Sequence, residues 1–371
     1  MRRNKSAFTV SLAVVLSSLM LLTGCGSNNA STPEASAPAA ESSAAPKTDA
    51  GETKKLVVTS FGGDYEKAQI EYAVKPFEKE FNAKVEVVTL YSADALARIR
   101  AEKNAQTIDV VQFSGGQEVQ AAKEGLIQKI DSSVLTNQKD LYANALNKDG
   151  YGPSLAFDAL GIIYNEQKIT TPPTSWEDLW KPEYKGHVGL VDITNTFGLQ
   201  FLVMNSMMAG GDESKMDPGF EKIKTLLPNT AAVVASTPDV GNLFAQEEAW
   251  IAPYDSGYAF NFRKQGQPIK FVMPKEGGMA TFINAQVVEG SKNPELAKQF
   301  VNYLLRPEVQ KAFAEQTGFA PTNQTVQLDP ELASVIPYGA EAVAELVPLN
   351  WEVVNQNREK WNETWSKLIS K

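Results

Sequence analysis

The sequence predicts an α/β fold with two lobes, and three observations support this. Short Val-rich runs alternate with amphipathic helical stretches from residue 55 onward. The alternation starts a second time near residue 150. About 317 residues follow the N-terminal segments, which is more than one compact core usually holds. We therefore expect two lobes joined by a hinge, each with a mixed, mainly parallel sheet flanked by helices.

The first lobe is predicted from three strand-like runs with helical stretches between them. The Val-rich runs show no alternation of apolar and polar residues, which is typical of strands buried on both faces. In the first helical stretch Ile70, Val74 and Phe77 recur at helical spacing. The predicted strands are 55–61, 84–90 and 108–114, and the predicted helices are 64–82, 92–106 and 116–127.

The second lobe begins near 150–165, and the chain later returns to the first. Its predicted segments are the runs 187–195 and 231–236, a long apolar helix at 197–211, and the returning runs 249–260, 269–278 and 280–288. A helix over 294–318 follows. We predict that lobe 1 comprises 55–157 and about 275–325. Lobe 2 then comprises about 158–274 and about 326–371, which includes the C-terminal helices.

The N-terminus predicts export and a lipid anchor. Arg2, Arg3 and Lys5 precede an apolar run at 7–22, which is typical of a signal peptide over residues 1–24 rather than of a membrane span. The box Leu-Thr-Gly-Cys at 22–25 resembles the bacterial lipobox, in which the cysteine is acylated. Cys25 is thus the predicted lipidation site, and the location is extracytoplasmic, on the outer face of the cell membrane. The alternative is a buried free thiol.

Residues 25–54 form the predicted linker, which carries the acylated cysteine. The segment contains almost no large apolar residue, so burial cannot offset its ordering entropy and we expect a disordered tether. Removing residues 1–24 changes the formal net charge from −9 to about −12, which argues against nucleic-acid binding. No cysteine follows Cys25, which excludes an intrachain disulfide and a Cys-based metal site. No cofactor and no metal are expected.

Three loops before predicted helices are candidates for ligand binding, at 61–64, 114–116 and 194–198. Glycines and hydroxyl residues at a helix start leave backbone N–H groups free near the positive end of the helix dipole, which suits an anion. Such loops lie at the carboxyl ends of strands, where open α/β sheets bind ligands. The alternative for any one loop is ordinary helix capping.

Four blocks of the sequence resemble bacterial spermidine/putrescine-binding proteins: residues 123–133, 174–186, 273–278 and 302–323. Those proteins are extracytoplasmic receptors of ABC importers. The resemblance runs from about Leu56 to the C-terminal residues and implies the type II periplasmic-binding-protein fold. It also implies a monomer that delivers a small solute to a permease and ATPase encoded by separate chains. The shared blocks are mainly scaffold, so they do not identify the solute.

Only some positions of the family's polyamine site are matched in this sequence. A polyamine pocket needs aromatic walls for the methylene chain and a carboxylate for each ammonium group. Ser114 and the Phe61/Tyr65 pair match the family pattern. A wall tyrosine is matched by Gly116 and a wall tryptophan by Asp255.

Further departures fall on the later segments of the site. The tryptophan and aspartate after the 273–278 block are matched by Thr281 and Ile283, and an acidic residue is matched by about Thr196, with Asp192 just upstream. The solute is therefore predicted to be polyamine-type or an amine-bearing zwitterion. The predicted ligand-binding residues are Phe61, Gly62, Gly63, Asp64, Tyr65, Ser114, Gly115, Gly116, Asp192, Thr194, Asn195, Thr196, Tyr254, Asp255, Thr281 and Asn284.

Other functions were weighed against this prediction. An enzyme is disfavoured because His187 is the single histidine and no nucleophile elbow, Walker loop or zinc-protease motif occurs. A ferric-ion receptor of the same fold favours neighbouring tyrosines, and here only Tyr254 and Tyr258 flank Asp255. A thiamine or phosphonate receptor remains an alternative. A surface adhesin explains the anchor but not the two lobes with glycine loops.

Overall fold

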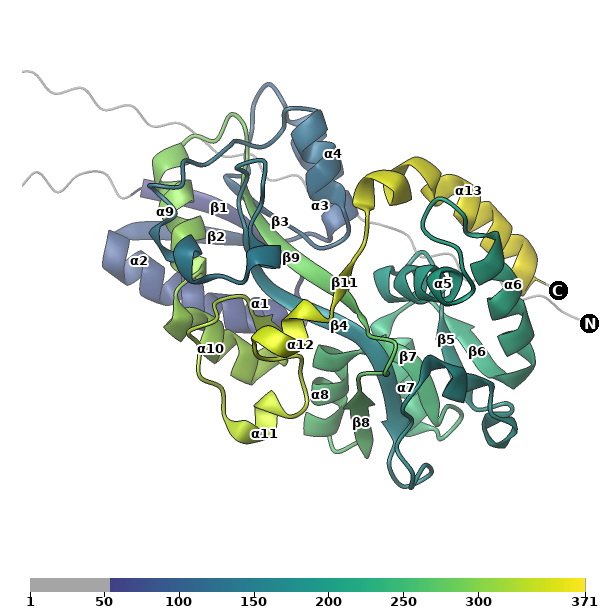
Figure 1. Ribbon diagram of the computed structural model, residues 1–371. Helices are drawn as coiled ribbons and strands as arrows, with labels where there is room; N and C mark the ends of the chain where they lie inside the picture. The colour runs from purple at the N-terminus through teal and green to yellow at the C-terminus, as the bar shows by residue number, and fades with distance from the viewer. Residues whose placement is uncertain (1–53, 371) are drawn as a thin grey trace, which may run out of the picture. The chain divides into compact units, whose positions relative to one another are not determined.

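One mixed β-sheet runs through the described part of the chain, residues 54–370 of the computed structural model (Figure 1). The order of its main strands is β2 (Ala83–Thr89), β1 (Lys54–Ser60), β3 (Val110–Phe113), β9 (Met279–Val287), β4 (Ser154–Asn165), β7 (Ile251–Asp255), β5 (Val188–Val191) and β6 (Thr230–Val234). Short strands extend it: β8 (Ile269–Val272) and β10 (Ala320–Pro321) pair with β4, and β11 (Val347–Pro348) pairs with β9.

The sheet has two parallel regions that share two central strands. β1 pairs in parallel with β2 and β3, and β5 pairs in parallel with β6 and β7. Between them β4 and β9 run antiparallel to each other, β9 runs antiparallel to β3, and β4 runs antiparallel to β7. The first half of β4 pairs with β9, and residues 160–164 pair with β7. The predicted two-lobed α/β fold is confirmed, and its two sheet regions are continuous through β4 and β9.

The helices cover both ends of this sheet. In Figure 1, α1, α2, α9 and α10 lie with β1 and β2, whereas α5, α6 and α13 lie with β5 and β6. Their bounds are α1 Gly63–Gln69, α2 Lys75–Phe81, α3 Ser92–Ala101, α4 Gln117–Lys123, α5 Thr196–Met208, α6 Asp217–Leu226, α7 Thr237–Ala245, α8 Ser256–Lys264, α9 Pro294–Leu304, α10 Pro307–Thr317, α11 Pro330–Ala333, α12 Ala340–Ala344 and α13 Trp351–Ile369. No helix among residues 54–370 is both long and apolar enough to cross a membrane.

Two predicted helices are interrupted by proline. The helix expected over 294–318 breaks at Arg306, which is extended because the ring of Pro307 disfavours the helical conformation of the preceding residue. The helix expected over 64–82 contains a π-helical turn at Ile70–Val74, just before Pro76. Proline has no N–H to donate to the preceding turn, which accounts for the local change of helix type.

Buried side chains form two large cores, one for each end of the sheet. The first core includes Val58, Phe77 and Phe300, and the second includes Trp176 and Leu202. Both central strands contribute to both cores, as expected for strands that pass from one lobe to the other. Helices α11 and α12 pack in a smaller cluster with β4 and β9, whereas α13 packs in the second core. The lobe boundaries given above stay a prediction.

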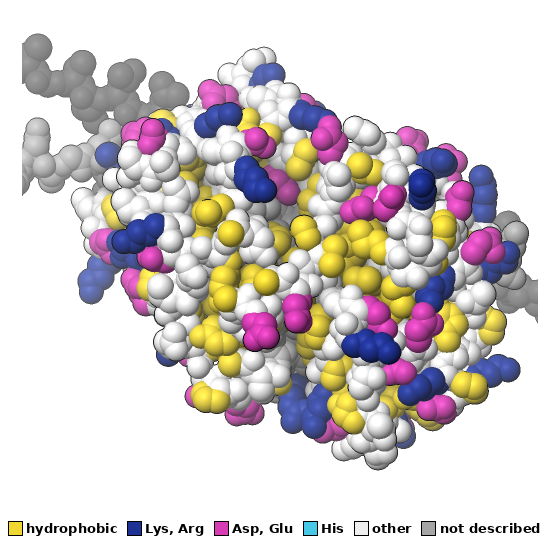
Figure 2. All heavy atoms as spheres, viewed as in Figure 1, with side chains coloured by type: hydrophobic (Ala, Val, Ile, Leu, Met, Phe, Trp, Pro, Cys, Tyr) yellow, Lys and Arg dark blue, Asp and Glu magenta, His cyan; other side chains and the backbone are white. Residues whose placement is uncertain are grey.

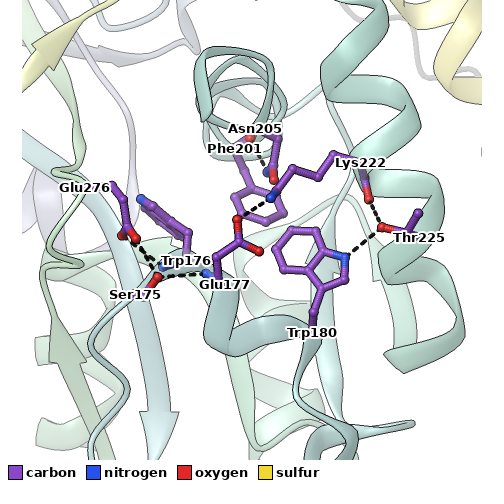
Figure 3. A network of polar contacts seen from close by, with 9 residues as sticks. All are labelled: Ser175, Trp176, Glu177, Trp180, Phe201, Asn205, Lys222, Thr225 and Glu276. Atoms are coloured by element: carbon purple, nitrogen blue, oxygen red, sulfur yellow. Dashed lines mark hydrogen bonds and ion pairs between the residues drawn. The ribbon is translucent and has the colours of Figure 1, made fainter. Parts of the chain in front are cut away.

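Two of the sequence blocks that carry the family resemblance meet at Trp176, which is fully buried (Figure 3). The Trp176 indole Nε1 donates a hydrogen bond to the Gly277 carbonyl at 2.9 Å, and its ring centroid lies 5.5 Å from that of Phe201. Ser175 Oγ donates to the Glu276 carboxylate at 2.5 Å. These contacts hold the 174–186 block against the segment that leads into β9, so both blocks are scaffold.

The signal peptide, Cys25 and the linker predicted from the sequence lie outside the described residues, apart from Lys54, which begins β1.

Candidate functional site

The first glycine loop presents an aromatic pair. Phe61 follows β1, and its ring centroid lies 5.1 Å from that of Tyr65 in the first turn of α1. Gly62 and Gly63 both have positive φ angles, which glycine adopts without a Cβ penalty. Asp64 is largely exposed and pairs with Lys67 at 2.8 Å, so its carboxylate is directed at solvent.

The second glycine loop is covered by helix α13. The Gly116 carbonyl accepts a hydrogen bond from Asn355 Nδ2 at 2.9 Å, and the Gly115 carbonyl accepts one from Arg358 Nη2 at 3.2 Å. A Cβ at Gly116 would lie 2.6 Å from the indole of Trp351. We call this set of interactions the α13 contact. The loop therefore meets a helix of the second core, and an indole packs on the glycine that matches a wall tyrosine of the family.

The same face carries a polar link between the lobes. Lys123 at the end of α4 pairs with Glu352 in the first turn of α13 at 2.6 Å. Both side chains are more than half exposed, so this pair stabilises the contact only weakly. Ser114 is held within the first lobe, because its N–H donates to Ser92 Oγ at 3.1 Å.

The third loop is mainly a helix cap. Asn195 Oδ1 accepts a hydrogen bond from the Phe197 N–H and caps α5, as the capping alternative predicts. Asp192 accepts hydrogen bonds from Thr194 N–H at 2.9 Å and from the Trp365 indole at 2.8 Å, which occupies both of its oxygens. Its carboxylate therefore serves the turn and α13 in this conformation.

The second and third loops nevertheless come together across the lobes. A Cβ placed on Gly115 would lie 3.5 Å from Thr196 Oγ1. Gly115 precedes α4 of the first lobe and Thr196 begins α5 of the second, so two of the three predicted loops face each other.

Three other predicted ligand-binding residues are engaged inside the sheet. Asp255 is fully buried, and its Oδ1 accepts a hydrogen bond from the Tyr258 N–H at 2.8 Å, which caps α8. Thr281 Oγ1 accepts one from Gln200 Nε2 at 2.9 Å. Asn284 Oδ1 accepts one from Ser154 Oγ at 2.7 Å. These side chains contact protein groups rather than open space.

Asp255 also contacts a second buried carboxyl that the sequence analysis missed, that of Asp158 in β4. We call Asp158 and Asp255 the acid pair. Both are fully buried, each carboxyl affects the pKa of the other, and Oδ2 of each has no hydrogen-bond partner among the described residues. Asp158 Oδ1 accepts hydrogen bonds from Ser256 Oγ at 2.5 Å and Gly257 N–H at 2.9 Å.

Burial raises the pKa of both carboxyls, because the charged form loses its hydration. The charge of Asp158 raises the pKa of Asp255 further, whereas donated hydrogen bonds favour the ionised form of Asp158. Two adjacent buried carboxylates do not ionise together near neutral pH. Asp255 therefore holds the proton and Asp158 the charge, so that the pair carries one negative charge.

The Asp255→Asn variant should have a flatter pH profile of stability than the wild type. Because the folded pKa of Asp255 is raised, the folded state binds this proton more tightly than the unfolded state. This contribution is complete below the unfolded pKa, about 3.9, and is lost as pH rises toward the folded pKa. As the pH rises from 4 to 8, the melting temperature of the variant should therefore increase relative to that of the wild type, as measured by calorimetry. Asp239→Asn, at an exposed first-turn carboxylate of α7, is the control, and an equal gain there would contradict the prediction.

A continuous row of aromatic rings connects the two cores. Ring centroids are 5.8 Å apart for Tyr65 and Phe319, 6.3 Å for Phe319 and Tyr258, and 5.9 Å for Tyr258 and Tyr254. With Phe61 at one end and Phe197 at the other, these residues form what we call the aromatic row. Phe319 was not predicted, although it lies in the 302–323 block.

Tyr91 is a further aromatic residue that sequence reasoning missed. It precedes α3 in the first lobe and is 66% exposed. An exposed ring at the start of α3 is a further candidate for ligand contact.

Apolar side chains also gather on the face shown in Figure 2, over the region of β11 and α5. A separate groove of about 470 Å³ lies between α1, α8 and the end of α10. Asp64 is the one predicted ligand-binding residue among those that line it.

His187, considered as an enzymatic residue, and Tyr254, considered as an iron ligand, both contact neighbouring side chains. The His187 ring stacks on Trp250 with centroids 3.6 Å apart, and the Tyr254 hydroxyl lies 2.5 Å from Thr237 Oγ1. Within residues 54–370 no group of three or more His, Cys, Asp or Glu side chains is arranged to hold a metal ion.

Comparison with known proteins agrees with this geometry. Residues 72–336 match the family described as bacterial extracellular solute-binding protein. The spermidine/putrescine-binding periplasmic protein of Escherichia coli is 33% identical over 271 residues, which cover 70% of this chain and 77% of that protein. The gamma-aminobutyric acid-binding protein of Pseudomonas aeruginosa is 25% identical over 294 residues, which cover 74% and 78%.

A solved structure of an ABC transporter protein from Clostridium perfringens has the same fold. Its TM-score is 0.74 at 27% identity, and the match covers 84% of this chain and 99% of that one. Such proteins are extracytoplasmic transport receptors, not enzymes, and act as the solute-binding component of ABC import. With a family match over most of its length, a relative at 33% identity and the two-lobed fold, the chain belongs to the bacterial extracellular solute-binding protein family.

Proposed function

We propose that this protein is a lipid-anchored receptor that captures a small amine-bearing organic solute, polyamine-type or zwitterionic, and delivers it to an ABC permease. The observation that carries the proposal is the meeting of the two lobes at the aromatic row and at Gly115 and Thr196. Aromatic faces bind ammonium groups by cation–π attraction. The relatives are named for binding spermidine, putrescine and gamma-aminobutyric acid, and each of these solutes carries an amine.

The proposed mechanism is closure of the lobes about β4 and β9. An open form exposes the residues of both lobes, and the solute selects the closed form because only that form contacts it from both sides. The α13 contact joins the lobes in the conformation described here and is formed or strengthened on closure. The closed protein then docks on a permease whose ATPase is a separate chain.

A solute screen tests this function. Spermidine, putrescine, 4-aminobutyrate, an aminophosphonate, thiamine and ferric citrate are each added to the purified protein, and melting temperature and small-angle scattering are recorded. A solute that binds only the folded protein raises the melting temperature, by about 2.7 kcal/mol of added stability at 100 times its Kd. We expect an amine to raise it and to reduce the radius of gyration. Absence of compaction with every solute, or chemical conversion of one, would overturn the proposal.

The anchor is tested separately with Cys25→Ser. Without the sulfur the acyl chain cannot be attached, so the variant should move from the membrane fraction to the soluble fraction. The measurement is immunoblotting of both fractions from expressing cells. Ser27→Ala, two residues away, is the matched control and should stay with the membrane. Membrane retention of Cys25→Ser would exclude Cys25 as the anchor.

A further inference from the structure

We propose that Gln112 is a positioning residue, whose side chain fixes the ring of Tyr65 in the aromatic row and keeps the Tyr65 hydroxyl away from the solute. This inference rests on the proposed function, because it concerns how the row meets a solute. It adds a residue of β3 that is not among the predicted ligand-binding residues.

The hydroxyl of Tyr65 is directed into the core of the first lobe. It donates a hydrogen bond to Gln112 Oε1, and only 8% of Tyr65 is exposed. The Tyr65 ring packs edge-on against Phe313, with centroids 4.8 Å apart, and its centroid lies 5.8 Å from that of Phe319 in the row. The ring thus belongs to the aromatic row, whereas the polar end of the side chain belongs to the core.

Gln112 is in turn held by the neighbouring strand β1. Its Nε2 donates a hydrogen bond to the Thr59 carbonyl at 3.1 Å, and its backbone N–H donates one to Thr59 Oγ1 at 2.8 Å. Gln112 is 1% exposed and is the one polar residue of β3, whose four residues are all buried. A buried amide costs free energy unless its nitrogen and its oxygen are both hydrogen-bonded, and Tyr65 supplies the donor to the oxygen.

The Thr59 carbonyl by itself does not account for a glutamine at position 112. This carbonyl also accepts a hydrogen bond from Gln69 Nε2 at 3.3 Å, so it keeps a partner when the side chain of Gln112 is replaced. Within the described residues, the distinct contribution of the Gln112 side chain is therefore its hydrogen bond to the Tyr65 hydroxyl.

Packing alone leaves room for the Tyr65 ring to move. A cavity of about 20 Å³ is bordered by Tyr65, Gln112 and Phe313, among other residues of the first lobe. One water molecule needs about 10–15 Å³, so the gap is large enough to allow a shift of the ring. The hydrogen bond to Gln112 therefore decides the position of the ring, and a solute meets the ring rather than the hydroxyl.

Calorimetry with 4-aminobutyrate and putrescine as probes tests this inference. Gln112→Met removes the acceptor with little change of size, and it should weaken binding of these amines by about threefold to tenfold, as expected for one lost hydrogen bond. Gln310→Met is the matched control, because Gln310 is 3% exposed and borders the same cavity but is hydrogen-bonded to Thr322. Both variants should lower the melting temperature, and only Gln112→Met should change the affinity.

A double-mutant cycle shows whether Gln112 acts through Tyr65. Tyr65→Phe removes the donor but keeps the ring, so it should weaken binding by a factor similar to that of Gln112→Met. The double variant should bind no more weakly than either single variant, because both substitutions remove the same hydrogen bond. A much larger loss for Tyr65→Phe than for Gln112→Met would place the hydroxyl on the solute and overturn the inference.

A readout without solute separates this inference from the proposed function. In NMR spectra of protein isotopically labelled at tyrosine Cζ, the Tyr65 signal is the one that Tyr65→Phe lacks. It should shift in Gln112→Met, because the Tyr65 hydroxyl loses its acceptor, and stay in place in Gln310→Met. An unshifted signal, or equal losses of affinity in the two glutamine variants, would overturn the positioning role. Failure of every amine to bind while the signal shifts as expected would overturn the proposed function itself.

Discussion

Replacing Trp176 by alanine should destabilise the protein by about 3–5 kcal/mol, the range typical of large aromatic residues removed from a core. The side chain is fully buried, packs against Phe201 and donates a hydrogen bond to the Gly277 carbonyl. Alanine leaves a cavity in the second core and removes the donor to the partly buried Gly277 carbonyl, and both cost free energy. Because Gly277 precedes β9, the loss also loosens the entry of a central strand.

Chemical denaturation measures this effect, and two variants separate its parts. Trp176→Phe keeps an aromatic ring but loses the donor to Gly277, so it should cost about 1–3 kcal/mol. Trp180→Ala removes an indole from the same short segment that is only partly buried, and it should cost less than Trp176→Ala. Equal losses for the two tryptophans would show that burial at Trp176 is not what holds this block in place.

Gly116→Ala should weaken solute binding by about tenfold or more, because it opposes closure at the α13 contact. Gly116 has a φ of 82°, a conformation that costs about 1–2 kcal/mol for a residue with a Cβ. The added Cβ would also lie 2.6 Å from the Trp351 indole, so that the indole or the loop must move. The backbone strain and the steric clash both destabilise the conformation in which α13 covers the loop.

Affinity by calorimetry and radius of gyration by scattering measure this prediction. Gly125→Ala is the matched control, since Gly125 also has a positive φ but nothing lies within 4 Å of its added Cβ. Gly125→Ala should have the energetic cost of a positive φ but no steric clash like the one between the added Cβ at Gly116 and the Trp351 indole. Adding Trp351→Ala to Gly116→Ala should recover part of the closure. If Gly116→Ala affects affinity no more than Gly125→Ala, the indole contact is not the reason for glycine at this position.

Much of the fold was readable in the sequence because its causes are local. Strands buried on both faces need apolar runs, and helices need apolar residues at a spacing of three and four, so the alternation after residue 55 predicts the α/β class correctly. The break between α9 and α10 is also local, and the restriction on the residue before Pro307 accounts for it.

The site was less accessible to sequence reasoning. The glycine loops were identified, and two of them do face each other at Gly115 and Thr196. In one of them the α13 contact engages the carbonyls of Gly115 and Gly116, and in another Asn195 accepts the Phe197 N–H as a helix cap. Asp255 was predicted to bind the solute, but its partner Asp158 was not.

By itself the sequence determined the α/β class, the two-lobed organisation and the family, since each follows from local patterns and short blocks of residues. Only the tertiary structure decided which groups meet. The acid pair depends on the register between β4 and β7, which brings together residues 97 positions apart, and the α13 contact joins positions about 240 apart. Burial and partners decide whether a carboxylate is a cap, a counter-charge or a proton carrier, and neither can be read from the residue's neighbours in the chain.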